Sequence, residues 1–238
     1  MRAVLRRADV AVTMSGQYAE RLRQLGVSQP ATVAQGADLN TFHPQHADEG
    51  LRRRLGVGPA DAMLVYAGRL DSEKHVDVLL RTLDALPAEP RFVLVIAGNG
   101  PLRVSLEARA ASDARLVVLP YLDKADLARV LASADVYVTA GPHEVFAFSV
   151  VEAQACGLPA VGGAAGGLVS RILPGLGFVG PVDDADAFAR NVLQAWEARA
   201  VLGPAARRHA EEHYSWQDAF HQLVSLYGPR GAAGGDGR

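Results

Sequence analysis

The sequence predicts an α/β fold with a doubly wound parallel sheet of the Rossmann-like type, and three observations support it. Short apolar runs rich in valine recur along the chain, and most of them end at Gly or Pro. Segments with apolar residues at helical spacing separate these runs. The runs are apolar throughout, which is typical of strands that helices bury on both faces. The right-handed crossover rule then places helices on both sides of the sheet.

The central region supplies the sheet and the helices that cover it. The predicted strands are residues 63–67, 92–97, 116–119, 136–139 and 160–162. The predicted helices between them are residues 76–86, 102–111 and 124–134. One more helix follows Glu144 and ends at the Cys-Gly-Leu-Pro of residues 156–159. Strand and helix alternate as a parallel sheet requires.

The regions on either side of the sheet are interpreted as other parts of the protein. Residues 1–45 contain a strand at 8–15, a helix at 17–25 and a short strand at 31–34, and we interpret them as a remnant of a preceding N-terminal domain with its connector. Residues 46–213 form the main domain, in which helices 185–197 and 205–213 follow the last strand. Residues 214–227 form a C-terminal crossing helix. Residues 228–238 contain Gly, Ala, Pro and charged residues, and we expect a disordered tail.

The composition excludes several functional classes. The 238 residues are 49% apolar and 21% charged, which suffices for an ordinary core. The 24 basic and 26 acidic side chains lack the basic excess of a nucleic-acid binder. No apolar run is long enough for a transmembrane helix, and residues 1–9 lack the apolar centre of a signal peptide. The single cysteine, Cys156, suggests a reducing cytoplasm, and we interpret it as a packed residue, not a nucleophile.

Two carboxylates mark a candidate site. Glu144 follows the strand at 136–139 and a Gly-Pro-His turn, and Glu152 lies in the helix that begins after it. This arrangement places both acids at the carboxyl edge of the sheet, where a helix N-terminus attracts anions. Two acids beside an anion site suit a ligand with a diphosphate and several hydroxyls, which describes a nucleotide sugar. The alternative is one exposed loop acid and one acid on a helix surface.

Basic and glycine residues follow the neighbouring strands. After the strand at 63–67, Gly68 permits a close backbone approach, and Arg69 and Lys74 add two cations that could bind a diphosphate and stabilise its departure. The alternative is a solvated surface loop. Gly98 begins a tight turn after the next strand, although such turns occur in many α/β proteins. The glycine-rich residues 162–167 indicate either another close approach to a ligand or a flexible loop.

The succession of these segments resembles the C-terminal half of the family-4 retaining glycosyltransferases, which are two-domain enzymes of the GT-B type. The resemblance covers roughly residues 8–227. The matching segments are residues 65–74, 97–102, 131–138, the Glu144–Glu152 pair with residues 153–159, and, ahead of the main domain, residues 12–15 and 36–44. The resemblance implies a GT-B donor domain as the fold of the main region.

The resemblance also implies a role for each candidate residue. Arg69 and Lys74 would hold the donor's diphosphate, Glu144 would contact hydroxyls of the transferred sugar, and Glu152 would bind the ribose hydroxyls. Of these, Glu144, Arg69 and Lys74 are the candidate catalytic residues. Enzymes of this family retain the anomeric configuration by a front-face displacement, so neither a metal nor a cofactor is expected. The donor substrate is a nucleoside-diphosphate sugar.

The start of the helix after Glu144 departs from the family pattern. Backbone amides around Ala147, Phe148 and Ser149 are expected to meet the phosphate. The family usually has Gly where Ala147 stands, so a positive φ or a close phosphate approach would strain or crowd this residue. Residues 168–170 and Gln35 also differ from the family pattern. These departures leave the predicted fold unchanged.

The expected function is the donor-binding part of a retaining glycosyltransferase, a hexosyltransferase. A domain that binds the acceptor and donates a catalytic histidine is expected in such enzymes, and most of it is absent. It would be lost, truncated or supplied by a complementary chain, and only through it would the protein associate peripherally with a membrane. Among the histidines, only His143 is expected in the donor cleft. The alternatives are a non-catalytic nucleotide-sugar-binding or partner-docking domain, and another GT-B activity such as a phosphorylase or an epimerase.

Overall fold

The computed structural model describes residues 8, 10–33 and 35–227. The predicted tail at 228–238 lies outside the described residues, as do part of the predicted strand at 8–15 and the end of the one at 31–34. The chain divides into two compact units, one formed by residues 37–212 and the other by residues 1–36 with 213–238. This division groups residues 37–45 with the main domain. The interpretation of the first segment as a remnant of a preceding domain stays a prediction.

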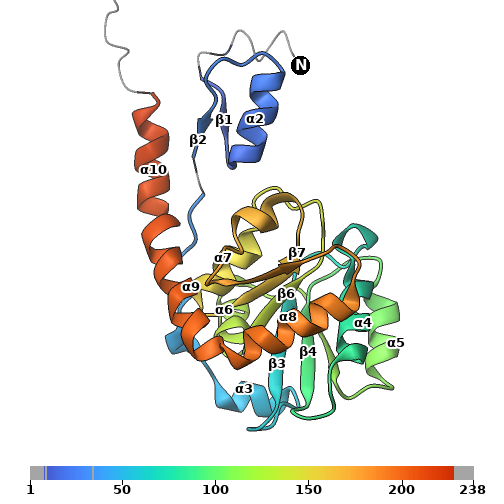
Figure 1. The fold of residues 1–238 in the computed structure, drawn as a ribbon. Helices are drawn as coiled ribbons and strands as arrows, with labels where there is room; N and C mark the ends of the chain where they lie inside the picture. Colours follow the sequence, from blue (N-terminus) through green and yellow to red (C-terminus); the bar gives the residue numbers. More distant parts are fainter. Residues whose placement is uncertain (1–7, 9, 34, 228–238) are drawn as a thin grey trace, which may run out of the picture. The chain divides into compact units, whose positions relative to one another are not determined.

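The larger unit contains a six-stranded sheet in which every neighbouring pair of strands is parallel (Figure 1). The strand order is β5-β4-β3-β6-β7-β8. The strands are β3 Ala62–Ala67, β4 Phe92–Ala97, β5 Leu116–Leu119, β6 Val136–Thr139, β7 Ala160–Gly163 and β8 Gly177–Gly180. The doubly wound parallel sheet is therefore confirmed, with the reversal of strand order between β3 and β6.

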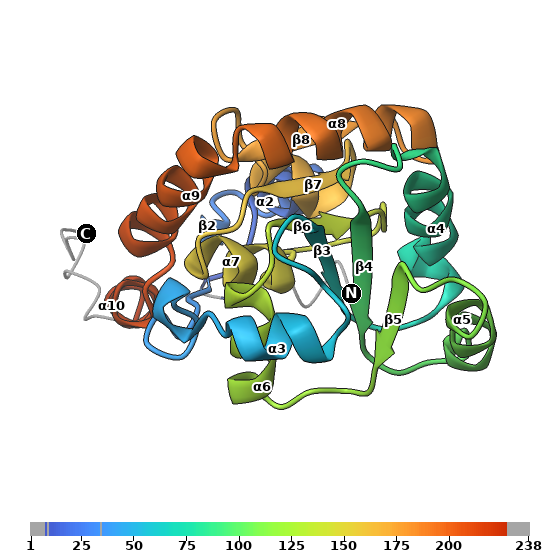
Figure 2. The same ribbon diagram turned by 90° about the horizontal axis from the view of Figure 1, so that it is seen from below.

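Helices cover both faces of this sheet, as Figure 2 shows. Helices α4 (Val76–Ala85), α5 (Arg103–Ala110) and α8 (Ala185–Glu197) lie on one face. Helices α3 (Glu49–Arg54), α6 (Lys124–Ala132) and α7 (Phe148–Ala155) lie on the other. Three 3₁₀ turns and a long helix complete the unit: η1 Pro44–His46, η2 Ser72–Lys74, η3 Gly166–Ser170 and α9 Arg199–His213. Since both faces are covered, every residue of β3 and β4 is buried.

Apolar packing and one carboxylate hold the centre of the sheet together. Side chains of α4, α5 and α8 pack on one face in a single core cluster with β3, β4 and β6. At the opposite end of the strands from the candidate site, the Asp135 carboxylate accepts hydrogen bonds from the Met63 backbone N–H at 2.7 Å and from Arg52 at 3.0 Å. A single acid thus ties β3 to the start of β6 and to helix α3.

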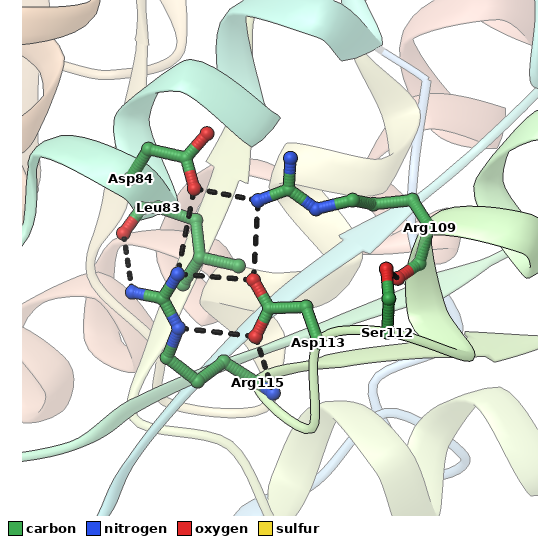
Figure 3. Close-up of polar contacts among 6 residues, drawn as sticks. All are labelled: Leu83, Asp84, Arg109, Ser112, Asp113 and Arg115. Atoms are coloured by element: carbon green, nitrogen blue, oxygen red, sulfur yellow. Dashed lines mark hydrogen bonds and ion pairs between the residues drawn. The ribbon is translucent and has the colours of Figure 1, made fainter.

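A second polar network fixes the start of β5 (Figure 3). The Asp113 carboxylate accepts hydrogen bonds from Arg115 at 3.0 Å and 3.1 Å and from Arg109 at 3.1 Å. Arg109 also pairs with Asp84 at the end of α4, and Arg115 donates to the Leu83 carbonyl. The Arg115 hydrogen bonds hold the pKa of the Asp113 carboxyl well below its ordinary value. The ionised carboxylate therefore stabilises the folded protein.

Two elements of the larger unit differ from the prediction. Strand β8 was not predicted, because only two residues of strand type lie between Gly177 and Gly180. Helix α9 begins at Arg199, whereas the predicted helix begins at residue 205. Pro204 lies inside the helix, where burial of nearby Leu202 and Ala206 stabilises the helical path.

The smaller unit contains one strand–helix–strand segment and one further helix. Strands β1 (Val12–Thr13) and β2 (Ala31–Thr32) pair in parallel, with α2 (Gly16–Gln24) between them in sequence. The Ser15 side chain caps α2 by accepting a hydrogen bond from the Tyr18 N–H. Helix α10 covers Trp216–Ser225. Within the described part of the chain, none of the helices has the length and apolar character needed to cross a membrane.

Candidate functional site

A cavity of about 540 Å³ lies at the carboxyl ends of β3, β4 and β6. Its position is the point where the strand order reverses, which is where open α/β sheets bind ligands. The volume falls within the range of small-molecule sites. All predicted site residues except Ala147 and His143 line it. The lining residues are Tyr66, Ala67, Gly68, Arg69, Lys74, Ala97, Gly98, Asn99, Tyr121, Leu122, Leu127, Thr139, Glu144, Phe148, Ser149 and Glu152.

The loop after β3 presents Arg69 at the mouth of this cavity. The buried Tyr66 hydroxyl donates a hydrogen bond to the Arg69 carbonyl at 2.8 Å, which fixes the loop backbone. A Cβ at Gly68 would come within 2.7 Å of the same hydroxyl, so only glycine fits there. The Arg69 side chain is 67% exposed and pairs with Asp71 at 3.1 Å and Glu73 at 3.2 Å. Its guanidinium is therefore able to turn toward a ligand without crossing a packed core.

Lys74 and Glu144 form an ion pair inside the cavity. The Lys74 Nζ lies 2.5 Å from the Glu144 Oε1, and each side chain is about one-fifth exposed. The two residues meet because Gly141 brings the loop after β6 against the Lys74 backbone. A Cβ at Gly141 would lie only 3.2 Å from the Lys74 Cα. A residue predicted to bind the diphosphate, Lys74, thus pairs directly with the residue predicted to contact the transferred sugar, Glu144.

Glu152 lies on α7 and lines the same cavity. Burial raises the pKa of its carboxyl to about 7, and the nearby Lys124 opposes this shift. The carboxyl therefore titrates much closer to neutral pH than an exposed glutamate does. Such a group can change its charge when a ligand hydrogen-bonds to one of its two forms.

The N-terminus of α7 faces the cavity through Phe148 and Ser149. The first N–H groups of a helix have no intrahelical partner and attract anions. Ala147, the residue before the helix, is buried and does not line the cavity. Its backbone adopts φ 59° and ψ 57°, so the positive φ considered from the family pattern is present. A residue with a Cβ is strained in this conformation.

We expect Ala147→Gly to raise the free energy of unfolding by about 0.5–1 kcal/mol, because relief of the left-handed strain exceeds the entropy that glycine adds to the unfolded chain. Urea denaturation monitored by circular dichroism measures this change. Ala153→Gly, in the middle of the same helix, is the matched control and should lose about 1 kcal/mol. Equal destabilisation by both changes would contradict the strain at Ala147.

The two glycine-rich segments have structural roles as well. A Cβ at Gly98 would lie 1.9 Å from the Gly68 carbonyl oxygen, so Gly98 allows the loops after β3 and β4 to pack together at the cavity. The Gly167 N–H donates to the Glu144 carbonyl at 2.5 Å, and a Cβ at Gly166 would also approach this carbonyl. The segment at 162–167 therefore supports the Glu144 loop from behind and does not line the cavity.

Several lining residues were not predicted, and one expected residue lies elsewhere. Tyr121 and Leu122 follow β5 at the same edge of the sheet, and Tyr121 is 79% exposed. Their position after a predicted strand was the signal that could have identified them. His143, expected in the donor cleft, is exposed and does not line the cavity. Among the residues that the structure describes, no group of three or more His, Cys, Asp or Glu is placed to hold a metal ion.

The fold is that of the GT-B glycosyltransferases. Sucrose-phosphate synthase from Thermosynechococcus elongatus superposes with a TM-score of 0.81 at 25% identity, over 95% of this chain and 59% of that one. HepE from Anabaena, in complex with UDP, superposes with a TM-score of 0.83 at 20% identity, over 92% of this chain and 64% of that one. The predicted GT-B type of the main domain is therefore confirmed.

The chain belongs to the family described as glycosyl transferases group 1, whose model matches residues 48–214. A GDP-mannose-dependent α-(1-6)-phosphatidylinositol dimannoside mannosyltransferase of Mycobacterium tuberculosis is 34% identical over 92% of this chain. A D-inositol 3-phosphate glycosyltransferase of Saccharomonospora viridis is 35% identical over 94% of this chain. The alignments cover 58% and 56% of these relatives, so the chain spans a little more than half their length.

Proposed function

We propose that this chain is the donor-binding part of a retaining glycosyltransferase that transfers a sugar from a nucleoside-diphosphate sugar to an acceptor. One observation carries the proposal: two cations and two carboxylates from separate segments line a single cavity at the switch point of the sheet. The names of similar proteins and the ligands bound in their structures support a nucleotide sugar as donor. HepE has been solved with UDP and with UDP-glucose, and a mannosyltransferase relative is GDP-mannose-dependent.

The proposed roles follow the charges in the cavity. Arg69 and Lys74 bind the diphosphate, and the N–H groups at the start of α7 bind the same anion. Glu144 accepts hydrogen bonds from hydroxyls of the transferred sugar. Glu152 accepts hydrogen bonds from the ribose hydroxyls, deeper along α7. Gly68, held over the Tyr66 hydroxyl, keeps the loop backbone close to the phosphates.

The proposed reaction is a front-face displacement. The bond between the anomeric carbon and the phosphate oxygen breaks, and a bond to the acceptor oxygen forms on the same face. The leaving phosphate oxygen takes the proton of the acceptor hydroxyl, so no side chain has to act as a nucleophile. Arg69 and Lys74 stabilise the charge that develops on the leaving diphosphate. Glu144 positions the sugar.

Transfer requires groups that hold the acceptor beside the donor. We propose that an acceptor-binding domain in a longer protein, or in a complementary chain, supplies them. Any association with a membrane would also occur through that domain or chain. The cytoplasmic location stays a prediction.

Calorimetry with UDP-glucose, GDP-mannose and ADP-glucose tests the donor site. One of these is expected to bind with 1:1 stoichiometry, because their shared diphosphate and hydroxyls match the charges of the cavity. Absence of binding by all three would refute the proposed donor site. The second candidate function, a non-catalytic binding module, predicts binding of the same ligand without release of nucleoside diphosphate.

Glu144→Gln separates these two candidates. With water as the acceptor, we expect it to reduce release of nucleoside diphosphate from the bound donor by at least about 100-fold, while affinity changes less than about 10-fold, because positioning acts mainly on the transition state. Coupled detection of the released nucleoside diphosphate measures turnover. Glu211→Gln, an acid that pairs with Arg207 outside the cavity lining, is the control and should retain turnover. Turnover that is equal in Glu144→Gln and in the unaltered chain would exclude the role of Glu144.

A further inference from the structure

Two residues with an unusual backbone conformation meet beside the segment that carries Lys74. Within the described part of the chain, three residues other than glycine have a positive φ, which are His75 (49°), Ala147 (59°) and Asp183 (67°). His75 and Asp183 are 108 positions apart in the sequence, yet the His75 Nδ1 lies 2.6 Å from the Asp183 Oδ1. Two of the three strained residues are therefore hydrogen-bonded to each other.

The left-handed conformation of His75 sets the path of the backbone at Lys74. Lys74 is the last residue of η2, and His75 ends that turn and precedes the first residue of α4. The His75 N–H donates to the Ser72 carbonyl at 3.2 Å, and the His75 carbonyl accepts from the Val78 N–H at 3.0 Å. The chain thus changes from the turn to the helix at this one residue. The direction of the Lys74 side chain depends on how His75 is held.

The His75 side chain supplies a contact that holds this conformation. A residue with a Cβ is strained in the left-handed region, so the surrounding structure has to favour it. The His75 side chain makes no capping hydrogen bond to α4. Its Nδ1 instead donates to Asp183, because a carboxylate can only accept.

The loop that carries Asp183 is itself anchored. The next residue, Asp184, caps α8 by accepting a hydrogen bond from the Ala187 N–H at 2.9 Å. The Asp183 carbonyl accepts a hydrogen bond from Arg81 of α4 at 3.3 Å. His75 therefore bonds to a loop that two helices hold in place.

We propose that His75 is a positioning residue for the Lys74 ammonium, and that Asp183 holds His75 in place. Gly141 packs against the Lys74 backbone, since a Cβ at Gly141 would lie 3.2 Å from the Lys74 Cα. The bond between His75 and Asp183 fixes the residue that follows. Neither His75 nor Asp183 lines the cavity, so both act through Lys74, which does. This inference rests on the proposed function.

Asp183→Gly tests the inference, because glycine accepts the positive φ and removes only the carboxylate. Calorimetry with the donor that the unaltered chain binds, among UDP-glucose, GDP-mannose and ADP-glucose, should give an affinity about 5- to 10-fold lower at an unchanged 1:1 stoichiometry. Asp183→Asn tolerates the positive φ and keeps an acceptor oxygen, so its affinity should stay within about twofold of the unaltered chain. Arg81→Gln, which removes another bond between α4 and this loop, is the control and should also stay within about twofold.

A double-mutant cycle with Lys74→Ala shows whether the effect passes through Lys74. In that background Asp183→Gly should change affinity less than about twofold, because the group that it positions is already removed. Full affinity of Asp183→Gly, an equal loss in Asp183→Asn, or the same loss in both backgrounds would overturn the inference while the proposed function stands. A lower stoichiometry at unchanged affinity would also overturn it, since that result indicates partial unfolding. Failure of the unaltered chain to bind any of the three donors would instead overturn the proposed function, and the inference with it.

Discussion

Replacing Lys74 with alanine is expected to weaken binding of the nucleotide sugar about 100-fold. A hydrogen bond between two ionised groups is worth more than a neutral one, and the Lys74 side chain is only about one-fifth exposed. The change also leaves the Glu144 carboxylate without its cation, so a negative charge then faces the diphosphate. Calorimetry at fixed ionic strength measures the effect, since salt screens such interactions.

The chain provides a close control for this prediction. Its only other lysine, Lys124, starts α6 and lies near Glu152 but does not line the cavity. Lys124→Ala removes the same charge and should weaken binding less than about fivefold. If the two substitutions weaken binding equally, Lys74 acts only through the general field of the protein and does not contact the diphosphate.

Glu152→Gln is expected to stabilise the protein at pH 8 and to have little effect on stability at pH 5. Burial raises the pKa of Glu152 in the folded protein to about 7, above its ordinary value of 4.5. A raised carboxyl pKa favours the folded state fully below pH 4.5, and this contribution is lost as the pH rises through 7. At pH 8 the amide avoids the buried charge, so the free energy of unfolding should rise by about 2–3 kcal/mol.

Asp113 serves as the control, because its pKa is shifted in the opposite direction from that of Glu152. Its folded-state pKa is lowered by Arg115, so its contribution is present above its ordinary value of 3.8 and is lost only as the pH falls below it (Figure 3). Asp113→Asn should therefore destabilise the protein at both pH 5 and pH 8. Denaturation curves for both variants at the two pH values test the pair. A stability gain for Glu152→Gln that is the same at both would contradict the raised pKa.

The affinity for the donor should change with pH as Glu152 titrates. Hydroxyl donors favour the ionised carboxylate, so affinity should rise up to about pH 7 and then level off. A nucleotide sugar suits this measurement because its esterified diphosphate lacks a proton that titrates in this range. In Glu152→Gln the pH dependence should disappear together with part of the affinity. This prediction concerns the proposed ribose contact and is independent of turnover.

The fold was largely predictable because local patterns determine it. The strands at 92–97, 116–119 and 136–139 have the predicted bounds, since continuous apolar runs between turn residues leave few alternatives. Strand β8 and the start of α9 were not predictable from local patterns. Strand β8 begins and ends with glycine, and α9 contains Pro204, so only packing against the rest of the unit favours the observed structure.

The candidate site was predictable in its residues but not in its contacts. Strand ends identified Arg69, Lys74, Glu144 and Glu152, because parallel strands bring their carboxyl ends to one edge. The ion pair between Lys74 and Glu144 and the raised pKa of Glu152 depend on how two loops and a helix pack together. No local pattern encodes these distances.

The buried Cys156 thiol at the end of α7 can be used to measure how often this part of the protein opens. Cys156 is almost fully covered, and burial raises its pKa to about 12, so very little reactive thiolate forms in the folded state. A thiol reagent should therefore label the chain only during excursions that expose this helix end. The labelling rate, with and without a nucleotide sugar, would report how strongly a ligand at the other end of α7 suppresses those excursions.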